Sequence, residues 1–456
     1  MIAPEIFRAY DIRGVVDETL TVDAVRAIGQ ALGTLAIEAG TPAITVGRDG
    51  RLSGPRLADA LCDGIVAAGA NAIDLGMVPT PVTYFAAHHL GCGSCVSVTG
   101  SHNPPEYNGI KMVIAGRTLA GEEIQALRAR IEAGRLATGN GKRSSAMVLD
   151  AYVARICGDV KLARPMRIAI DCGNGVGGLV AGKLFRALGC EVDELYCDVD
   201  GNFPNHHPDP SQPKNLQDLI ARLAQGGIEL GLAFDGDGDR LGVVTRDGEV
   251  IFPDRQLMLY AADVLSRNPG AEIIFDVKST RLLTPWIESH GGRATIWKTG
   301  HSFIKAKLAE TGALLAGEMS GHTFFKERWY GFDDALYTGA RLLEILSRSE
   351  DGNTVLKSLP NAPSTPELQW RLAEGEPHAL IERLQAALPF PGAERVLTLD
   401  GVRAEYADGF GLARASNTTP VVVLRFEADN AAALKRIQEE FRAALQPLKP
   451  AAPLPF

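Results

Sequence analysis

Leu230-Gly-Leu-Ala-Phe-Asp-Gly-Asp-Gly-Asp-Arg240 is the stretch of this chain that most clearly indicates its fold. Five residues form a short apolar run, which is typical of a buried strand, and the run ends abruptly in a loop with three aspartates. Four features precede this stretch along the chain. They are an apolar strand, a helix, the glycine Gly189 and a second strand, in that order. This order of elements predicts an α/β unit whose polar loop follows its third strand.

The same order of elements occurs three times along the chain. The first strands are Ala43-Ile-Thr-Val-Gly-Arg48, Arg167-Ile-Ala-Ile-Asp171 and Glu272-Ile-Ile-Phe-Asp276. We expect helices near residues 57–68, 179–188 and 282–289, second strands at 72–75, 191–195 and 294–297, and third strands at 95–98, 230–234 and 313–316. The third strands end in three polar loops, at 99–103, 235–239 and 317–322. The repeat lies in the architecture and not in the residue identities.

The pattern changes after about residue 361. The linker Asn361-Ala-Pro-Ser-Thr-Pro366 precedes an amphipathic helix, two strand-like runs and a last helix at 430–445. We therefore expect an α/β protein with three similar mixed-sheet domains (1–147, 148–249 and 250–361) and a smaller C-terminal α+β domain (362–456). Because open sheets bind ligands beyond the carboxyl ends of their strands, the three polar loops should meet in one central cleft.

Composition excludes several classes of protein. Acidic residues outnumber basic ones by 55 to 46, and no long basic tract is present, which argues against a nucleic-acid partner. No run of about 18 apolar residues is present to span a membrane, and the N-terminus lacks the pattern of a signal peptide. The seven scattered cysteines suit reduced thiols, so a cytoplasmic protein without disulfides is expected, and we assign Cys92-Gly-Ser-Cys95 no function.

Ser101 lies in Thr99-Gly-Ser-His-Asn-Pro104, directly after an apolar strand. Pro104 and Pro105 block a helix, so the hydroxyl is expected on a constrained and exposed turn, where it could act as a nucleophile. An ordinary serine-rich turn is the alternative. A Ser-His-Asp hydrolase is disfavoured because no Gly-x-Ser-x-Gly elbow surrounds the serine.

Asp235, Asp237 and Asp239 bring three carboxylates within five residues, an arrangement that is costly without a cation. Oxygen ligands of this kind suit Mg²⁺. A calcium loop is excluded because its sixth and twelfth positions, which need glycine and glutamate, are Arg240 and Arg246. A solvated acidic turn remains the other interpretation.

Gly173-Asn-Gly-Val-Gly-Gly178 matches the fingerprint of dinucleotide-binding turns, so a nicotinamide-dependent oxidoreductase is the second functional hypothesis. Glycines at this turn also serve close packing of strand and helix. A third hypothesis is a sugar-phosphate sensor without turnover, which the serine and aspartate loops disfavour.

The loop between the last two strands, Arg414-Ala-Ser-Asn-Thr-Thr-Pro420, offers a guanidinium, hydroxyls and an amide, the groups that bind a phosphate. Loops rich in Ser and Thr are also common without a ligand. Further candidates follow strands or flank the serine loop, and each has an ordinary surface role as its alternative: Tyr10, Arg13, Lys111, Lys278 and His301.

These runs together resemble the α-D-phosphohexomutase superfamily, and most closely its bacterial phosphomannomutase/phosphoglucomutase branch, over the whole chain. Thr99–Gly109 resembles the phosphoserine loop of that family, Asp235–Arg240 its metal loop, Gly317–His322 its sugar-recognition loop and Arg414–Thr419 its phosphate-binding loop. The resemblance implies a phosphoserine domain, a metal-binding domain, a sugar-recognition domain and a phosphate-binding domain around a central cleft. The sugar loop, with Met319 after Glu318, resembles the corresponding loop of enzymes that act on both mannose and glucose phosphates.

The resemblance also implies a reaction and its residues. Hexose 1-phosphate and hexose 6-phosphate would interconvert through a phosphorylated Ser101 and a hexose 1,6-bisphosphate, with glucose 1,6-bisphosphate as intermediate or activator. Mg²⁺ would bind Ser101, Asp235, Asp237 and Asp239, and the protein would be a monomer. The implied catalytic residues are Ser101, Arg13, His102, Lys111, Arg240 and His301, and the implied substrate-binding residues are Tyr10, Lys278, Glu318, Ser320, Arg414, Ser416, Asn417 and Thr418.

Overall fold

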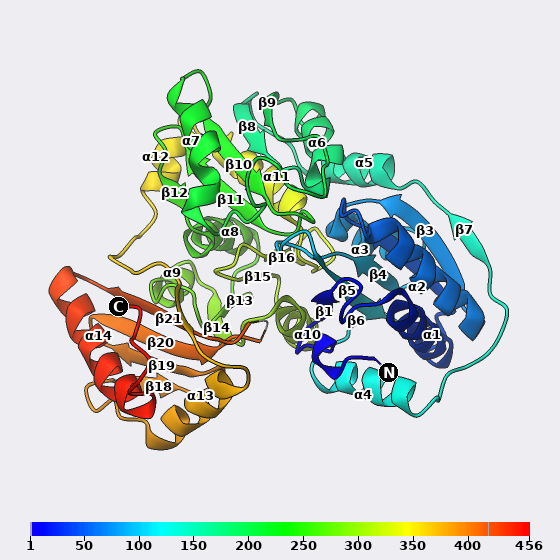
Figure 1. The fold of residues 1–456 in the computed structure, drawn as a ribbon. Coiled ribbons are helices and arrows are strands. Elements are labelled where there is room, and N and C mark those ends of the chain that lie inside the picture. The colour runs from blue at the N-terminus through cyan, green and yellow to red at the C-terminus, as the bar shows by residue number, and fades with distance from the viewer. Residues whose placement is uncertain (1, 418) are drawn as a thin grey trace.

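A computed structural model describes residues 2–417 and 419–456 of the chain. Four β-sheets succeed one another along the sequence, and each defines a unit with its own helices (Figure 1). None of the helices in the described residues is long and apolar enough to cross a membrane.

The first unit contains the longest sheet, in the order β1-β5-β4-β2-β3-β7 with β6 beside β5. Its strands are β1 (Ile12–Val15), β2 (Ala43–Arg48), β3 (Asn71–Met77), β4 (Cys95–Val98), β5 (Tyr107–Ile114), β6 (Arg117–Thr118) and β7 (Arg143–Ser145). Its helices are η1 (Pro4–Ile6), α1 (Val22–Glu38), α2 (Gly54–Ala68), α3 (Thr80–His89) and α4 (Glu122–Glu132).

The second unit has the strand order β12-β11-β10-β8-β9, and the third has β14-β13-β15-β16. The strands are β8 (Arg167–Asp171), β9 (Glu191–Leu195), β10 (Leu230–Phe234), β11 (Leu241–Thr245), β12 (Val250–Ile251), β13 (Glu272–Asp276), β14 (Arg293–Trp297), β15 (Leu315–Gly317) and β16 (Thr323–Phe325). The helices are α5 (Leu149–Asp159), η2 (Val176–Leu179), α6 (Ala181–Ala187), η3 (Pro213–Leu216), α7 (Gln217–Ala224), α8 (Pro253–Arg267), α9 (Leu283–Ser289), α10 (His301–Thr311), α11 (Ala335–Leu346) and α12 (Gly352–Lys357).

The fourth unit is an antiparallel sheet in the order β17-β21-β20-β19-β18 with two helices beside it, at the red end of the chain in Figure 1. It comprises β17 (Leu368–Arg371), α13 (Glu376–Ala387), β18 (Arg395–Leu397), β19 (Val402–Tyr406), β20 (Gly409–Ala415), β21 (Val421–Ala428), α14 (Ala431–Leu445) and η4 (Gln446–Leu448). The expected α+β class is confirmed, although the sequence indicated only two of these strands, because the others are short or lie at edges.

The three predicted repeats have one topology. In each, the first strand (β2, β8, β13) lies between the second (β3, β9, β14) and the third (β4, β10, β15) and is parallel to both. A fourth strand (β5, β11, β16) then pairs antiparallel with the third. The expectation of three similar mixed sheets is therefore confirmed.

This topology explains where the polar loops lie. The strand pairs Val98↔Ile110, Phe234↔Leu241 and Gly317↔Thr323 close the serine, aspartate and sugar loops, so each loop joins the third strand to the antiparallel fourth. The pair Ala415↔Val422 closes the corresponding hairpin of the fourth unit. All four loops therefore begin at the carboxyl end of a strand.

The four units differ in how much apolar core they share with one another. The first unit has a core of its own, whereas the second and third share one continuous cluster that also reaches α3 of the first. The fourth has a separate core and meets the third through a small apolar contact of Val277 with Phe410 and Leu412. Arg403 adds hydrogen bonds to the carbonyl oxygens of Val277 and Ser279, both 2.7 Å long.

One local expectation from the sequence is wrong. The helix expected from residue 179 begins at Ala181, because a 3-10 turn, η2, comes first. The polar stretch around Arg13 forms the short strand β1 (Ile12–Val15) at the edge of the sheet. Arg13 is tolerated there because it pairs with Asp11 at 2.5 Å.

Candidate active site

A cavity of about 440 Å³ lies where the four units meet. Residues from every unit line it, including twelve of the candidates from the sequence: Tyr10, Arg13, Ser101, His102, Lys111, Arg240, Lys278, His301, Glu318, Ser320, Arg414 and Ser416. Asn417 instead lines a second cavity of about 310 Å³ next to α13, and Thr418 lies outside the described residues. The loops thus converge on one cleft, as the topology requires.

Ser101 lies at the wall of this cavity and is only 1% exposed, so the expectation of an exposed turn is wrong. Its backbone has a positive φ of 51°, which is uncommon for a residue with a side chain. The hydroxyl lies 3.3 Å from Asp235 Oδ2 and 3.2 Å from His102 Nδ1. The serine is therefore reachable through the cleft and is held beside the aspartate loop.

The carboxylates of Asp235, Asp237 and Asp239 are fully buried, and their nearest oxygens lie within 4.8 Å of one another. Asp235 Oδ1 accepts hydrogen bonds from the backbone N–H groups of Gly238 and Asp239, each 3.0 Å long, which curl the loop around it. Among the described residues Asp237 Oδ1 is buried without a hydrogen-bond partner. An orphaned carboxylate oxygen beside two other carboxylates is the donor set expected for a divalent cation with hard oxygen ligands.

Positive charge surrounds this acidic group. Lys111 Nζ donates to Asp237 Oδ2 at 2.8 Å and also to Asp239 Oδ2, and Arg240 Nε lies 3.9 Å from Asp235 Oδ2. Burial lowers the pKa of Lys111, but Asp237 and Asp239 outweigh that effect and the net pKa is raised, so the lysine is charged. Burial, followed by the neighbouring carboxylates, raises the pKa of Asp235 well above its ordinary value.

Two histidines at the cavity are neutral. Burial holds the pKa of His102 and of His301 well below the ordinary value, and nearby arginines or lysines add to that effect. His301 begins α10, and its Nδ1 lies 3.7 Å from Asp333 Oδ2. A neutral imidazole has a free lone pair for a proton, and that of His102 is the one beside the serine hydroxyl, with Nδ1 3.2 Å from Ser101 Oγ.

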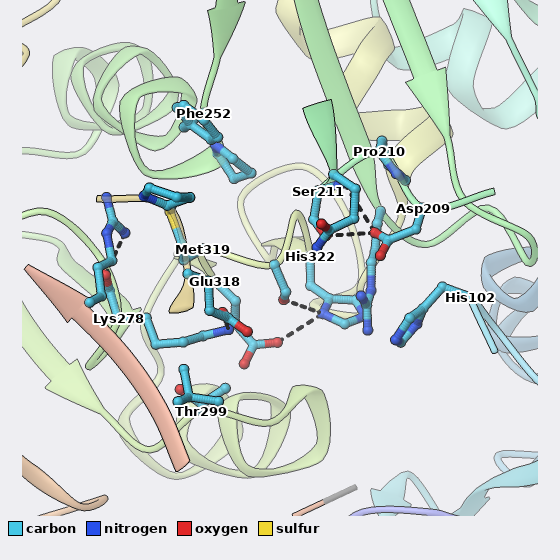
Figure 2. Close-up of a pocket in the computed structure, with 18 of the residues that line it drawn as sticks. His102, Asp209, Pro210, Ser211, Phe252, Lys278, Thr299, Glu318, Met319 and His322 are labelled. Atoms are coloured by element: carbon cyan, nitrogen blue, oxygen red, sulfur yellow. Dashed lines mark hydrogen bonds and ion pairs between the residues drawn. The ribbon is translucent and has the colours of Figure 1, made fainter. Parts of the chain in front are cut away.

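The sugar loop is held from two sides. Glu318 Oε1 accepts the N–H of Gly300 at 2.6 Å, and its Oε2 lies 2.9 Å from His322 Nδ1, so the two side chains point toward one another (Figure 2). Asp276, the last residue of β13, accepts the N–H of Met319 at 3.1 Å. Glu318 and Ser320 consequently line the cavity from a fixed backbone.

The hairpin of the fourth unit brings Arg414 to the opposite side of the cavity. The guanidinium is 3% exposed, and its Nε donates to Asp400 Oδ2 at 3.1 Å. Its Nη2 has no hydrogen-bond partner in the part of the chain that the structure describes. With Lys278, which pairs with Glu367 at 2.9 Å, this arginine makes the end of the cleft cationic.

Several site residues were not found from the sequence. Asp209, Glu367 and Arg425 line the cavity, and their only sequence signal is a charged residue in an irregular segment or a strand. Arg51 lies behind the serine loop and binds its backbone. The signal for Arg51 was present, since Arg48-Asp49-Gly-Arg51 runs past the end of β2 just where ligand loops are expected.

The glycine-rich turn of the oxidoreductase hypothesis packs against protein backbone. A Cβ on Gly175 would lie 2.9 Å from Gly236 Cα, and one on Gly178 would lie 2.0 Å from the carbonyl oxygen of Cys197. These glycines therefore allow the turn to support the aspartate loop. All seven cysteines are free thiols.

Comparison with known proteins adds four family matches and close relatives. The models for phosphoglucomutase/phosphomannomutase match in order, alpha/beta/alpha domains I, II and III at residues 4–138, 150–248 and 252–362 and the C-terminal domain at 367–444. The phosphoglucomutase of Neisseria meningitidis serogroup A is 59% identical over 448 residues, which are 98% of this chain and 97% of that protein. The phosphomannomutase/phosphoglucomutase of Pseudomonas aeruginosa PAO1 is 57% identical over 452 residues, 99% of this chain and 97% of that protein. The crystal structure of a phosphoglucomutase/phosphomannomutase family protein from Burkholderia thailandensis is 59% identical, with a TM-score of 0.94 and 100% of each chain covered.

Proposed function

Since the chain belongs to the phosphoglucomutase/phosphomannomutase family, we propose that it interconverts the 1-phosphates and 6-phosphates of mannose and glucose, with Ser101 as the phosphoryl carrier. The enzyme is an isomerase that transfers a phosphoryl group within its substrate. One observation carries the residue assignment: Ser101 Oγ lies 3.3 Å from Asp235, inside a cavity to which all four units contribute.

Asp235, Asp237 and Asp239, with the phosphorylated Ser101, would hold Mg²⁺. When bound, this cation supplies positive charge that stabilises the transferring phosphoryl group. The buried oxygen of Asp237 that lacks a partner supports this assignment. Lys111 and Arg240 add fixed positive charge around the same group.

Transfer breaks the bond between phosphorus and Ser101 Oγ and forms a bond between phosphorus and the free hydroxyl of the sugar. The proton of that hydroxyl passes to a base of the protein, and the candidates for this base are the imidazoles of His102 and His301, which line the cavity and are neutral. Arg13 donates to Asn103 Oδ1 at 2.6 Å and so holds the serine loop in place.

The substrate's own phosphate would bind the cationic end of the cleft, on Arg414, Ser416 and Lys278. Asn417, which lines the neighbouring cavity, and Thr418, which lies outside the described residues, stay predictions from the sequence. Tyr10, Glu318 and Ser320 would contact the sugar. The product of the first transfer is a hexose 1,6-bisphosphate. This intermediate reverses its orientation in the cleft and then transfers its other phosphate to Ser101. Glucose 1,6-bisphosphate would therefore phosphorylate Ser101 of an unphosphorylated enzyme and so activate it.

A cytoplasmic location and a monomeric state complete the proposal. Seven free thiols support a reducing compartment. The cavity is built within one chain, which supports a monomer. Fractionation with a periplasmic marker tests the first, and light scattering at several concentrations tests the second.

Intact-mass analysis and a coupled assay test the function. We expect the purified protein to carry one phosphate and to convert mannose 1-phosphate and glucose 1-phosphate in the presence of Mg²⁺, with slower turnover of glucosamine 1-phosphate. Ser101→Ala should remove the phosphate and lower kcat at least about 1,000-fold. Ser53→Ala is the matched control, because the Ser53 hydroxyl lies near the serine loop and, among the described residues, accepts a side-chain hydrogen bond from Asn108 Nδ2 alone, at 2.9 Å, so the variant should keep both properties. An active Ser101→Ala variant would exclude Ser101 as the carrier.

A further inference from the structure

Arg51 is a buried cation that the proposed chemistry does not use. It follows β2, and its side chain is 0% exposed. Its Nε pairs with Asp49 Oδ2 at 3.2 Å, and its backbone N–H donates to Asp49 Oδ1 at 3.0 Å. A buried arginine needs several acceptors, so the partners of its remaining N–H groups indicate its role.

Those partners are backbone oxygens of the serine loop. Nη2 donates to the carbonyl oxygens of Ser101, at 2.9 Å, and Asn103, at 2.5 Å. Nη1 donates to those of Pro104, at 2.5 Å, and Tyr107, at 2.9 Å. Because prolines 104 and 105 have no N–H, the loop has fewer backbone donors of its own, and one guanidinium satisfies four of its carbonyls.

Asp49 binds the beginning of the same loop. Its Oδ2 accepts the hydroxyl of Thr99 at 2.8 Å and the N–H of Gly100 at 3.1 Å. The pair Asp49–Arg51, which we call the loop clamp, therefore contacts the backbone on both sides of Ser101. This two-sided contact explains how Ser101 keeps its positive φ.

Two glycines allow the loop clamp, the serine loop and the aspartate loop to pack closely. A Cβ on Gly100 would lie 2.4 Å from Arg51 Cζ, so only glycine admits the guanidinium there. On the other side, a Cβ on Gly236 would lie 2.5 Å from the carbonyl oxygen of Ser101. The Ser101 peptide thus lies between Arg51 and the aspartate loop. The ring of Phe203, from the second unit, packs over the guanidinium at 5.3 Å.

We propose that Arg51 is a positioning residue for phosphoryl transfer, which holds the Ser101 backbone so that the phosphoryl carrier faces the aspartate loop. Arg51 lies behind the loop and is not part of the cavity wall, so it acts through Ser101 and not on the substrate. The inference rests on the proposed function, because it presumes that Ser101 carries the phosphate.

The test compares Arg51→Lys and Arg51→Ala with Arg341→Lys. Arg341 is an equally buried arginine, which pairs with Asp263 and Glu327 away from the cavity. We expect kcat to fall about 100-fold in Arg51→Ala, since a displacement of about 1 Å at a reacting atom has this effect, with KM changed less than about threefold. Arg51→Lys keeps the positive charge but loses the planar guanidinium with its several N–H donors. Its kcat should therefore lie between that of Arg51→Ala and that of the wild-type enzyme. Arg341→Lys should melt at a lower temperature and keep kcat.

Single-turnover transfer from the phosphorylated enzyme to glucose 1-phosphate shows whether the chemical step is affected. We expect this rate to fall in both Arg51 variants. If Arg51→Lys melts earlier but transfers at the wild-type rate, Arg51 is merely structural and the positioning role is refuted. If the wild-type enzyme itself carries no phosphate and shows no mutase activity, the proposed function fails and this inference fails with it. If Arg51→Ala does not fold, the comparison of Arg51→Lys with the wild-type enzyme still decides between the two outcomes.

Discussion

Replacing Asp235 by asparagine should make the metal-free protein more stable while it impairs the reaction. The three carboxylates of the aspartate loop lie within 4.8 Å of one another. Two unit charges at this separation repel by roughly 3.5 kcal/mol at an effective dielectric constant of about 20. Asp235→Asn removes two such repulsions.

The same substitution removes one attraction and keeps the local hydrogen bonds. Arg240 Nε, 3.9 Å from Asp235 Oδ2, attracts the carboxylate by roughly 4 kcal/mol on the same scale. The asparagine oxygen can still accept the N–H groups of Gly238 and Asp239, although less strongly than a carboxylate. Because burial and the neighbouring carboxylates raise the pKa of Asp235, these charges apply in full only where Asp235 is ionised. We therefore expect a net stabilisation of up to about 3 kcal/mol without a cation, which should be largest at alkaline pH.

Thermal melting in EDTA and in a Mg²⁺ titration, together with the mutase assay, measures the effect. In EDTA, Asp235→Asn should melt a few degrees above wild type. Mg²⁺ should raise the wild-type melting temperature more, since a ligand at about 100 times its Kd adds roughly 2.7 kcal/mol and the variant binds it more weakly. The variant should also lose at least about 100-fold in kcat. Asp247→Asn, an exposed aspartate of the same unit paired with Lys357, is the control and should show no change in the response to Mg²⁺.

Either of two results would contradict this role of Asp235. One is a variant that melts below wild type in EDTA, because repulsion among the carboxylates would then not be a net cost. The other is an equal rise of melting temperature with Mg²⁺ in both proteins, because Asp235 would then not bind the cation.

Two further predictions concern phosphate binding and pH. Arg414→Lys removes the planar fork and should lower kcat/KM about 10- to 100-fold, in steady-state kinetics, with the phosphorylation of Ser101 intact; unchanged kinetics would place the substrate phosphate elsewhere. Burial raises the pKa of Asp334 to about 7, so the folded protein binds a proton more tightly than the unfolded chain, and the free energy of unfolding should fall by about 2 to 3 kcal/mol as pH rises from 5 to 8. Asp334→Asn should flatten that part of the dependence of the melting temperature on pH, and an unchanged slope would assign it to other groups.

The sequence predicted the parts of the fold that depend on local patterns. Short apolar runs ended by polar loops indicated the three sheets, and the topology then required the loops of Ser101, Asp235 and Glu318 to meet. The burial of Ser101 was not predictable, because it depends on Gly236 and Arg51 packing against its peptide from distant parts of the chain. The role of Arg51 was missed for the same reason, since its acceptors lie about 50 residues further along.

Asn417 shows another limit of sequence reasoning. Its position in a polar hairpin beside Arg414 suggested a place in the main cleft, yet it lines the neighbouring cavity. Ser416 and Asn417 lie in the turn after β20, which ends at Ala415, and the sequence alone does not tell which side of a turn faces the ligand. The alternation of Ser416 in one cavity and Asn417 in the other is the consequence.

One detail of the repeated topology recurs in two of the three units. Asp49 and Asp276 both stand at the end of a first strand, and each binds the backbone of the loop after the third strand, through Gly100 and Met319 respectively. The equivalent residue of the second repeat, Asp171, accepts the N–H of Gly173 and contacts His206 instead. In the first and third units the anchor is therefore the same while the anchored loop differs, so a serine loop and a glutamate loop occupy equivalent places at the cleft.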